Sequence, residues 1–134
     1  MSSAEIQTTA RWKPISVWIV KALLGLAFLA AGCAKLYGVP MMVESFERIG
    51  FGQWFRYVTG ALEIIGAITI LIPSVSAFGA LLLSCIMVGA IITHLVIGGS
   101  VIPAIALLLM SMTVAFAHRN QLGDALDWFN GDNA

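Results

Sequence analysis

The chain contains few charged residues, and this shortage restricts the class of protein to which it belongs. Only 10% of its 134 residues are Asp, Glu, Lys or Arg, whereas about 25% is usual in a soluble domain. So few charges could not cover the surface of a soluble protein of this length. Seven basic residues balance seven acidic ones, so the chain also lacks the basic surface that binds nucleic acid. We therefore expect no nucleic-acid partner.

Cysteine and histidine are also scarce. The two cysteines, Cys33 and Cys85, lie far apart and belong to no CxxC pattern, so they predict neither a disulfide framework nor a zinc site. The two histidines, His94 and His118, do not have the spacing of a metal-binding pair on one helix, and we predict no metal site. The sequence also lacks a phosphate-binding glycine loop and a nucleophile motif.

Apolar residues are abundant instead, at 60% of the chain with a mean hydropathy of +0.95. A helix that crosses the hydrocarbon core of a bilayer needs about 20 apolar residues. Very short breaks separate the second, third and fourth apolar segments, so neighbouring helices must be antiparallel. The sequence predicts an all-α membrane protein, an antiparallel four-helix bundle with both termini on the same side. Its helices are expected at residues 15–36, 55–72, 75–97 and 101–116.

A polar N-terminal segment (residues 1–14) and a polar tail (residues 119–134) flank this transmembrane domain (residues 15–118). Within the long loop, residues 40–50 begin with proline and end with glycine, which predicts a short helix. We expect this helix to lie in the membrane interface as a cap over the mouth of the bundle. The tail has a similar amphipathic pattern and predicts a second interfacial helix. The alternative is that both segments only anchor the protein in the membrane. The apolar side of the loop helix comprises Met42, Val43, Phe46 and Ile49.

The orientation in the membrane is weakly encoded, because Lys and Arg are equally frequent beside the two faces of the predicted bundle. Lys21 adds a positive charge to the side of the termini if its long side chain reaches back to that surface. We therefore predict an inner-membrane location with both termini in the cytoplasm.

Four ionisable residues lie within the predicted spans, where a charge is costly and by default has a functional reason. These residues are Lys21, Lys35, Glu63 and His94. On the first helix the spacing of Lys21, Gly25, Phe28, Gly32 and Lys35 predicts one stripe that faces the bundle interior. Gly60, Glu63 and Gly66 predict a similar inward face on the second helix.

Lys35, Glu63 and His94 come from three helices but are expected in the same half of the bundle, beneath the loop helix. Lys21 belongs to the opposite half, where we interpret it as an anchor. The three residues allow two interpretations. They form either a structural ion-pair network or a small polar pocket, in which Lys35 and His94 donate to a ligand oxygen while Glu63 orients them or takes a proton. We favour the pocket.

Two motifs in these helices resemble a known family. Gly25, Phe28, Gly32, Lys35 and Gly38 are spaced as in the first helix of DoxX-like membrane proteins. The run from Gly60 through Glu63 to Gly66 resembles that family's second helix, and His94 matches a polar residue late in the third helix less firmly. The similarity covers essentially the whole predicted bundle.

The resemblance implies a four-helix inner-membrane protein, from a superfamily whose characterised members take part in redox chemistry at membranes. One of these members is a small subunit of a thiosulfate:quinone oxidoreductase, but the cysteine pair of the thiosulfate-oxidising members is not evident here.

We therefore expect a subunit or accessory of an oxidoreductase system that binds a quinone or a similar redox lipid near Lys35, Glu63 and His94. The sequence shows no electron carrier, so this function requires a partner membrane or redox protein. One alternative is a membrane assembly factor or scaffold, in which Lys35 and Glu63 are purely structural. A third is a small-solute transporter, which would need to oligomerise to form a conducting pore.

Overall fold

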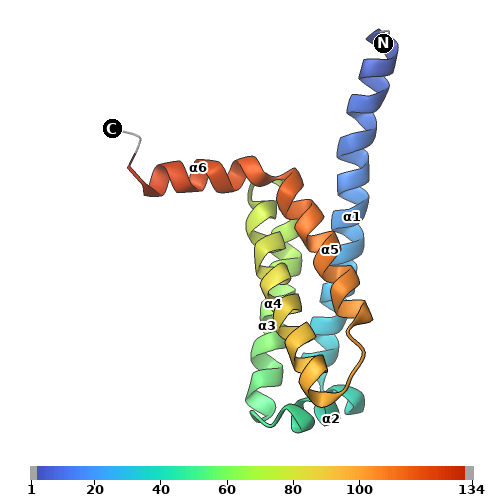
Figure 1. The fold of residues 1–134 in the computed structure, drawn as a ribbon, viewed down its shortest axis with the longest axis vertical. Helices are drawn as coiled ribbons and strands as arrows, with labels where there is room; N and C mark the ends of the chain where they lie inside the picture. The colour runs from blue at the N-terminus through green and yellow to red at the C-terminus, as the bar shows by residue number, and fades with distance from the viewer. Residues whose placement is uncertain (1–2, 132–134) are drawn as a thin grey trace.

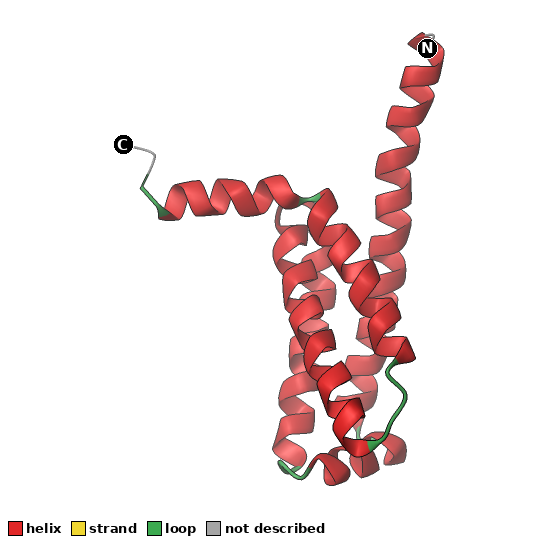
Figure 2. Ribbon diagram, in the orientation of Figure 1, coloured by secondary structure: helices red, strands yellow, loops and turns green. Residues whose placement is uncertain are grey.

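The computed structural model describes the backbone of residues 3–131 and the side chains of residues 14–131. This described part consists of helices joined by short turns, with no strand (Figure 2). The all-α architecture predicted from the sequence is confirmed. The elements are α1 (Ser3–Tyr37), α2 (Pro40–Ile49), α3 (Gln53–Leu71), the short 3₁₀ helix η1 (Pro73–Val75), α4 (Ser76–Ile97), α5 (Ile102–Ala117) and α6 (Arg119–Phe129).

Three stretches of the described chain are long and apolar enough to cross a membrane by themselves: Pro14–Tyr37, Gln53–Leu71 and Pro73–Ile97. Helix α5 has 16 residues, which is about 24 Å at 1.5 Å per residue and shorter than a hydrocarbon core of about 30 Å. The chain bends by 63° between α5 and α6, and this bent pair counts as a fourth span if it is taken together. The chain is therefore a multi-pass membrane protein.

The helix boundaries differ from the predicted ones mainly at the N-terminus. Helix α1 begins at Ser3 instead of residue 15, so the predicted polar segment is helical from Ser3 onward and Pro14 lies inside the helix. A helix satisfies its own backbone hydrogen bonds, so α1 continues into polar sequence, although Pro14 removes one donor and its ring crowds the preceding turn. The other boundaries agree within two residues. Residues 1–2 of the predicted N-terminal segment and 132–134 of the predicted tail lie outside the described residues.

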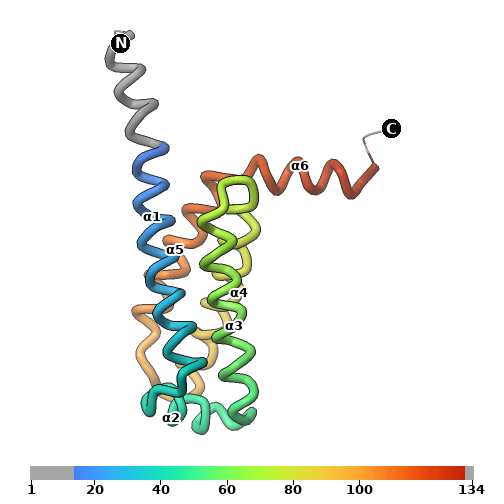
Figure 3. The backbone as a smooth tube through the Cα atoms, turned by 180° about the vertical axis from the view of Figure 1, so that it is seen from behind, coloured from blue at the N-terminus to red at the C-terminus, as the bar shows by residue number. Residues whose placement is uncertain are grey.

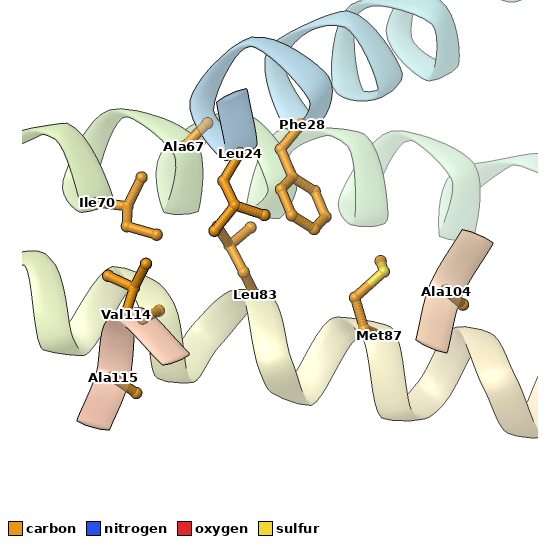
Figure 4. Packing of buried hydrophobic residues seen from close by; sticks show 10 residues of the cluster. Leu24, Phe28, Ala67, Ile70, Leu83, Met87, Ala104, Val114 and Ala115 are labelled. Carbon is orange, nitrogen blue, oxygen red and sulfur yellow. The ribbon is translucent and has the colours of Figure 1, made fainter. Parts of the chain in front are cut away.

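The helices of the bundle pack around a core of buried apolar side chains (Figure 4). Leu24 and Phe28 of α1 point toward Leu83 and Met87 of α4 in this core. Large apolar side chains also cover the outer surface, for example Leu26 on α1. A protein whose core and outer surface are both apolar is suited to a lipid environment.

Helix α2 lies across the end of the bundle where α1 ends and α3 begins, which is most easily followed from behind (Figure 3). Phe46 of α2 is buried, and its ring centroid lies 5.8 Å from that of Phe55 on α3. Gly50 has a φ of +85° and ends the helix in the left-handed conformation that glycine adopts readily. The predicted cap helix therefore exists, with its predicted apolar side turned toward the bundle.

Helix α6 projects sideways from the opposite end of the bundle, and α1 extends beyond the bundle at that same end (Figure 1). Gln121 fixes the start of α6: its Nε2 donates to the carbonyl of Pro73 at 2.6 Å, and its Oε1 accepts from the amide of Ala77 at 3.0 Å. Trp128 and Phe129 near its far end are exposed. The predicted helix in the tail is thus present, and its placement in the membrane interface stays a prediction.

Candidate functional site

Lys35 and Glu63 form an ion pair inside the bundle. The Lys35 ammonium donates to both carboxylate oxygens of Glu63, at 3.0 Å (Oε1) and 2.9 Å (Oε2). The Glu63 side chain is only 2% exposed and that of Lys35 is 12% exposed. Each charge would be costly alone at this depth, and the two direct hydrogen bonds compensate part of that cost. The pair joins α1 to α3.

The two side chains meet because glycines let the backbones of α1 and α3 approach closely. A Cβ placed on Gly32 would lie 2.8 Å from the carbonyl oxygen of Gly60, and one on Gly60 would lie 3.0 Å from Cβ of Lys35. The inward stripe predicted for α1 is confirmed, since Lys21, Phe28 and Gly32 are buried. The glycines of the first two helices thus set the separation that the ion pair requires.

Arg56 extends this contact into a network that the sequence analysis missed. Its Nη1 donates to the main-chain carbonyl of Lys35, and its Nε donates to Oε1 of Gln53 at 2.8 Å. Gln53 in turn donates from Nε2 to the carbonyl of Val43 in α2 at 3.2 Å. The network therefore connects α1, α3 and α2 at the end of the bundle where the ion pair lies.

The sequence contained a signal that Arg56 faces the interior of the bundle. Arg56, Gly60 and Glu63 follow spacings of four and three, so they share one face of α3. From its position near a helix end, Arg56 was expected only to add a positive charge beside the membrane, whereas the structure buries it on the same inward face as Glu63.

His94 lies near the end of α4 and lines the same cavity as Lys35 and Glu63. Its Nδ1 is buried without a hydrogen-bond partner among the described residues. Gly99 lies directly beside the ring, and a Cβ at that position would clash with Nδ1. Within the described part of the chain, no hydrogen bond joins His94 to the ion pair. The structure therefore brings the three predicted residues around one cavity but places only two of them in direct contact.

The cavity has a volume of about 690 Å³ and lies between the helices at the α2 end of the bundle. This volume falls within the range of about 300–1,000 Å³ that is usual for small-molecule sites. Met42, Phe46 and Ile49 of α2 contribute to its wall, so the cap helix covers it as predicted. Its polar lining comprises Lys35, Ser45, Thr59, Glu63, Thr93, His94 and Ser100. Most of the remaining lining is apolar, for example Phe28, Leu62, Ile86, Met87 and Leu107.

Lys21 takes no part in this cavity. It is 1% exposed, its Nζ lies 3.5 Å from Nε2 of His118, and it lies 4.5 Å from the centroid of the Trp18 ring. His118 connects α5 to α6 at the end of the bundle opposite α2. The predicted separation of Lys21 from the other three ionisable residues is therefore observed.

The comparison with known families matches the part of the chain that builds this site. The model of the DoxX-like family matches residues 19–117, which include Lys35, Glu63, His94 and the cavity. The chain belongs to the DoxX-like family.

Two relatives of this DoxX-like protein come from Bacillus subtilis. One, named "Putative oxidoreductase CatD", is 27% identical over 79 residues, which is 59% of each chain. The other, named "Uncharacterized protein YdgD", is 33% identical over 81 residues, which is 58% of this chain and 71% of the relative. The chain thus spans less than two thirds of the length of CatD. No solved structure matches the chain.

Proposed function

We propose that this DoxX-like protein binds a quinone or a similar lipid-soluble redox molecule, as a subunit or accessory of a membrane redox system. One observation carries the proposal: a buried lysine–glutamate pair lies in the wall of a largely apolar cavity within the bundle. An apolar cavity with a few polar groups is the usual form of a small-molecule site, and a lipid-soluble ligand suits its apolar lining.

The polar groups of the cavity have complementary roles in this proposal. The Lys35 ammonium donates to a quinone oxygen and stabilises the negative charge that the oxygen gains on reduction. The imidazole of His94 serves as a second donor, because its buried Nδ1 has no hydrogen-bond partner among the described residues and can therefore bond to a ligand. Glu63 holds the Lys35 ammonium in place, and its carboxylate is the group suited to accept or relay a proton.

The electrons must come from a partner, because reduction of a quinone to a quinol consumes two electrons and two protons. We therefore propose a membrane or redox protein as partner. The printed name of CatD, which calls that relative an oxidoreductase, supports a redox association without identifying the reaction. The proposed location is the inner membrane, with both termini in the cytoplasm.

The test is ligand binding by the purified protein in lipid nanodiscs. Organic extracts of wild type and Glu63→Gln are compared by mass spectrometry, and the affinity for a short-chain quinone analogue is measured for both. We expect an enriched redox lipid in wild type, and at least tenfold weaker binding by the variant. Glu47→Gln is the matched control, because Glu47 is exposed on α2 and does not line the cavity. Equal quinone binding by wild type and Glu63→Gln would contradict the proposal.

The second candidate is a membrane scaffold or assembly factor, and the network itself favours it. The ion pair and Arg56 connect three helices, which is what a purely structural role requires. The charge swap Lys35→Glu with Glu63→Lys separates the two candidates. It retains an ion pair between α1 and α3, so a scaffold keeps its abundance and partner assembly. Because the swap places the ammonium on α3 and the carboxylate on α1, the direction of the donor toward the ligand changes and a quinone site loses affinity.

A further inference from the structure

Helices α3 and α4 pack tightly at the end of the bundle near η1. A Cβ on Gly66 of α3 would lie 2.6 Å from the side chain of Leu83 on α4. A Cβ on Gly79 of α4 would lie 3.0 Å from the carbonyl oxygen of Gly66. Close approach through small residues is the usual way in which membrane helices associate. At this end, no room exists for a ligand between the two helices.

Toward α2 the same two helices leave space between them. Val58 and Leu62 of α3 and Gly89 and Thr93 of α4 all line the cavity. Val58 is 44% exposed, Leu62 is 37% exposed, and Gly89 is also exposed. A residue that lines a cavity and is also exposed marks a place where the cavity is open. The cavity therefore opens sideways between α3 and α4, within stretches that are apolar enough to span the membrane.

Gly89 differs from the packing glycines of the bundle. A Cβ at Gly25, Gly32, Gly60, Gly66 or Gly79 would meet a neighbouring helix, whereas a Cβ at Gly89 would meet no atom within 4 Å. Glycine is unfavourable inside a helix, and no close helix contact accounts for it at this position. What Gly89 provides is open space at the rim of the cavity.

We propose that the ligand enters the cavity laterally from the hydrocarbon of the bilayer, through an opening between α3 and α4 whose width is set by Gly89. The inference rests on the proposed function, and it restricts the ligand to molecules that dissolve in the membrane. At the nearest end, α2 covers part of the cavity and its Phe46 is buried against the bundle, but the lining residues Met41 and Ser100 are exposed there as well. At the opposite end, the core residues Leu24, Ile70, Leu83 and Val114 fill the interior.

The test is the rate of binding in variants that fill the opening. Gly89→Ala, Gly89→Leu and Gly89→Trp add side chains of increasing size at a position with free space. Cys85→Leu is the matched control, because Cys85 is exposed one turn away on α4 and does not line the cavity. Association and dissociation of a fluorescence-quenching quinone analogue are followed by stopped flow in nanodiscs, together with equilibrium affinity and helical content.

A closed entrance slows association and dissociation of the ligand by the same factor. We expect both rates to fall in the order Ala, Leu, Trp, by tenfold or more for Gly89→Trp. Cys85→Leu should behave as wild type. If wild type binds the analogue and Gly89→Trp leaves both rates unchanged, or weakens affinity without slowing dissociation, the lateral entrance is wrong although the site stands. If wild type binds no analogue, the proposed function fails, and the entrance fails with it.

Discussion

Arg56 of α3 donates a hydrogen bond from Nη1 to the main-chain carbonyl of Lys35, in the last turn of α1. The last carbonyls of a helix have no partner within the helix, and inside a membrane they cannot rely on water. Arg56 therefore serves α1 as a C-terminal cap while it holds Gln53, which in turn binds α2. The side chain of Arg56 thereby stabilises both the end of α1 and the position of α2.

Replacement of Arg56 by methionine should loosen this end of the bundle. The change leaves the Lys35 carbonyl and the Gln53 side chain without their donor, at a cost of about 1–3 kcal/mol. The expected result is a lower melting temperature in detergent and faster proteolysis around α2. Arg48→Met is the control, because Arg48 is exposed on α2 and should tolerate the same change. Equal melting temperatures for the two variants would show that Arg56 contributes little to the fold.

Removing the charge of one member of the ion pair should lower the stability of the protein far more than removing both charges. Glu63→Gln leaves the Lys35 ammonium without its counter-charge, which for a buried pair costs about 3–5 kcal/mol. The double variant Lys35→Met with Glu63→Leu removes both charges and should regain most of the melting temperature and cellular abundance.

The same double variant tests the site separately from the fold. If the proposed function is correct, it stays unable to bind the quinone analogue although it is stable. A double variant that binds as well as wild type would show that the pair has only a structural role.

Gly99 should control the direction of the His94 ring. A Cβ at Gly99 would clash with Nδ1, so Gly99→Ala must turn the imidazole or displace the loop that follows α4. We expect ligand affinity to fall about as much as in His94→Ala, with helical content and melting temperature close to wild type. Gly123→Ala is the control, because a Cβ there meets nothing within 4 Å.

A double-mutant cycle decides whether Gly99 acts through His94. Adding Gly99→Ala to His94→Ala should cause no further loss of affinity, because the ring that it displaces is already absent. Additive losses would show that Gly99 affects the cavity by another route.

Gln121 should hold α6 in its sideways position. Gln121→Ala removes the hydrogen bonds to Pro73 of η1 and to Ala77 at the start of α4, and the cost is about 1–3 kcal/mol for that local contact. We expect faster hydrogen exchange and proteolysis within α6, with quinone affinity unchanged because the cavity is at the other end. Asn120→Ala should have no effect, since Asn120 is exposed. Unchanged exchange within α6 in Gln121→Ala would show that other contacts hold it.

Much of the site could be predicted because charged residues are rare within membrane-spanning segments and are therefore easily recognised in the sequence. Lys35 and Glu63 interrupt apolar helices, and their spacing from glycines places them on inward faces. A charge in hydrocarbon needs a counter-charge, so the ion pair could be expected before any contact was known. Arg56 was missed because a residue near a helix end reads equally well as an exposed charge, and burial cannot be decided from one helix alone.

The sequence by itself determined that the chain enters the membrane, where its spans begin and end within a few residues, and which stripe of the first two helices turns inward. These properties depend on hydropathy and on the 3.6-residue period of one helix. The tertiary structure alone decided that α3 and α4 touch at one end and leave a cavity at the other, and that α6 leaves the bundle sideways. Distances between helices follow from how side chains of several segments fit together, and no single segment contains that information.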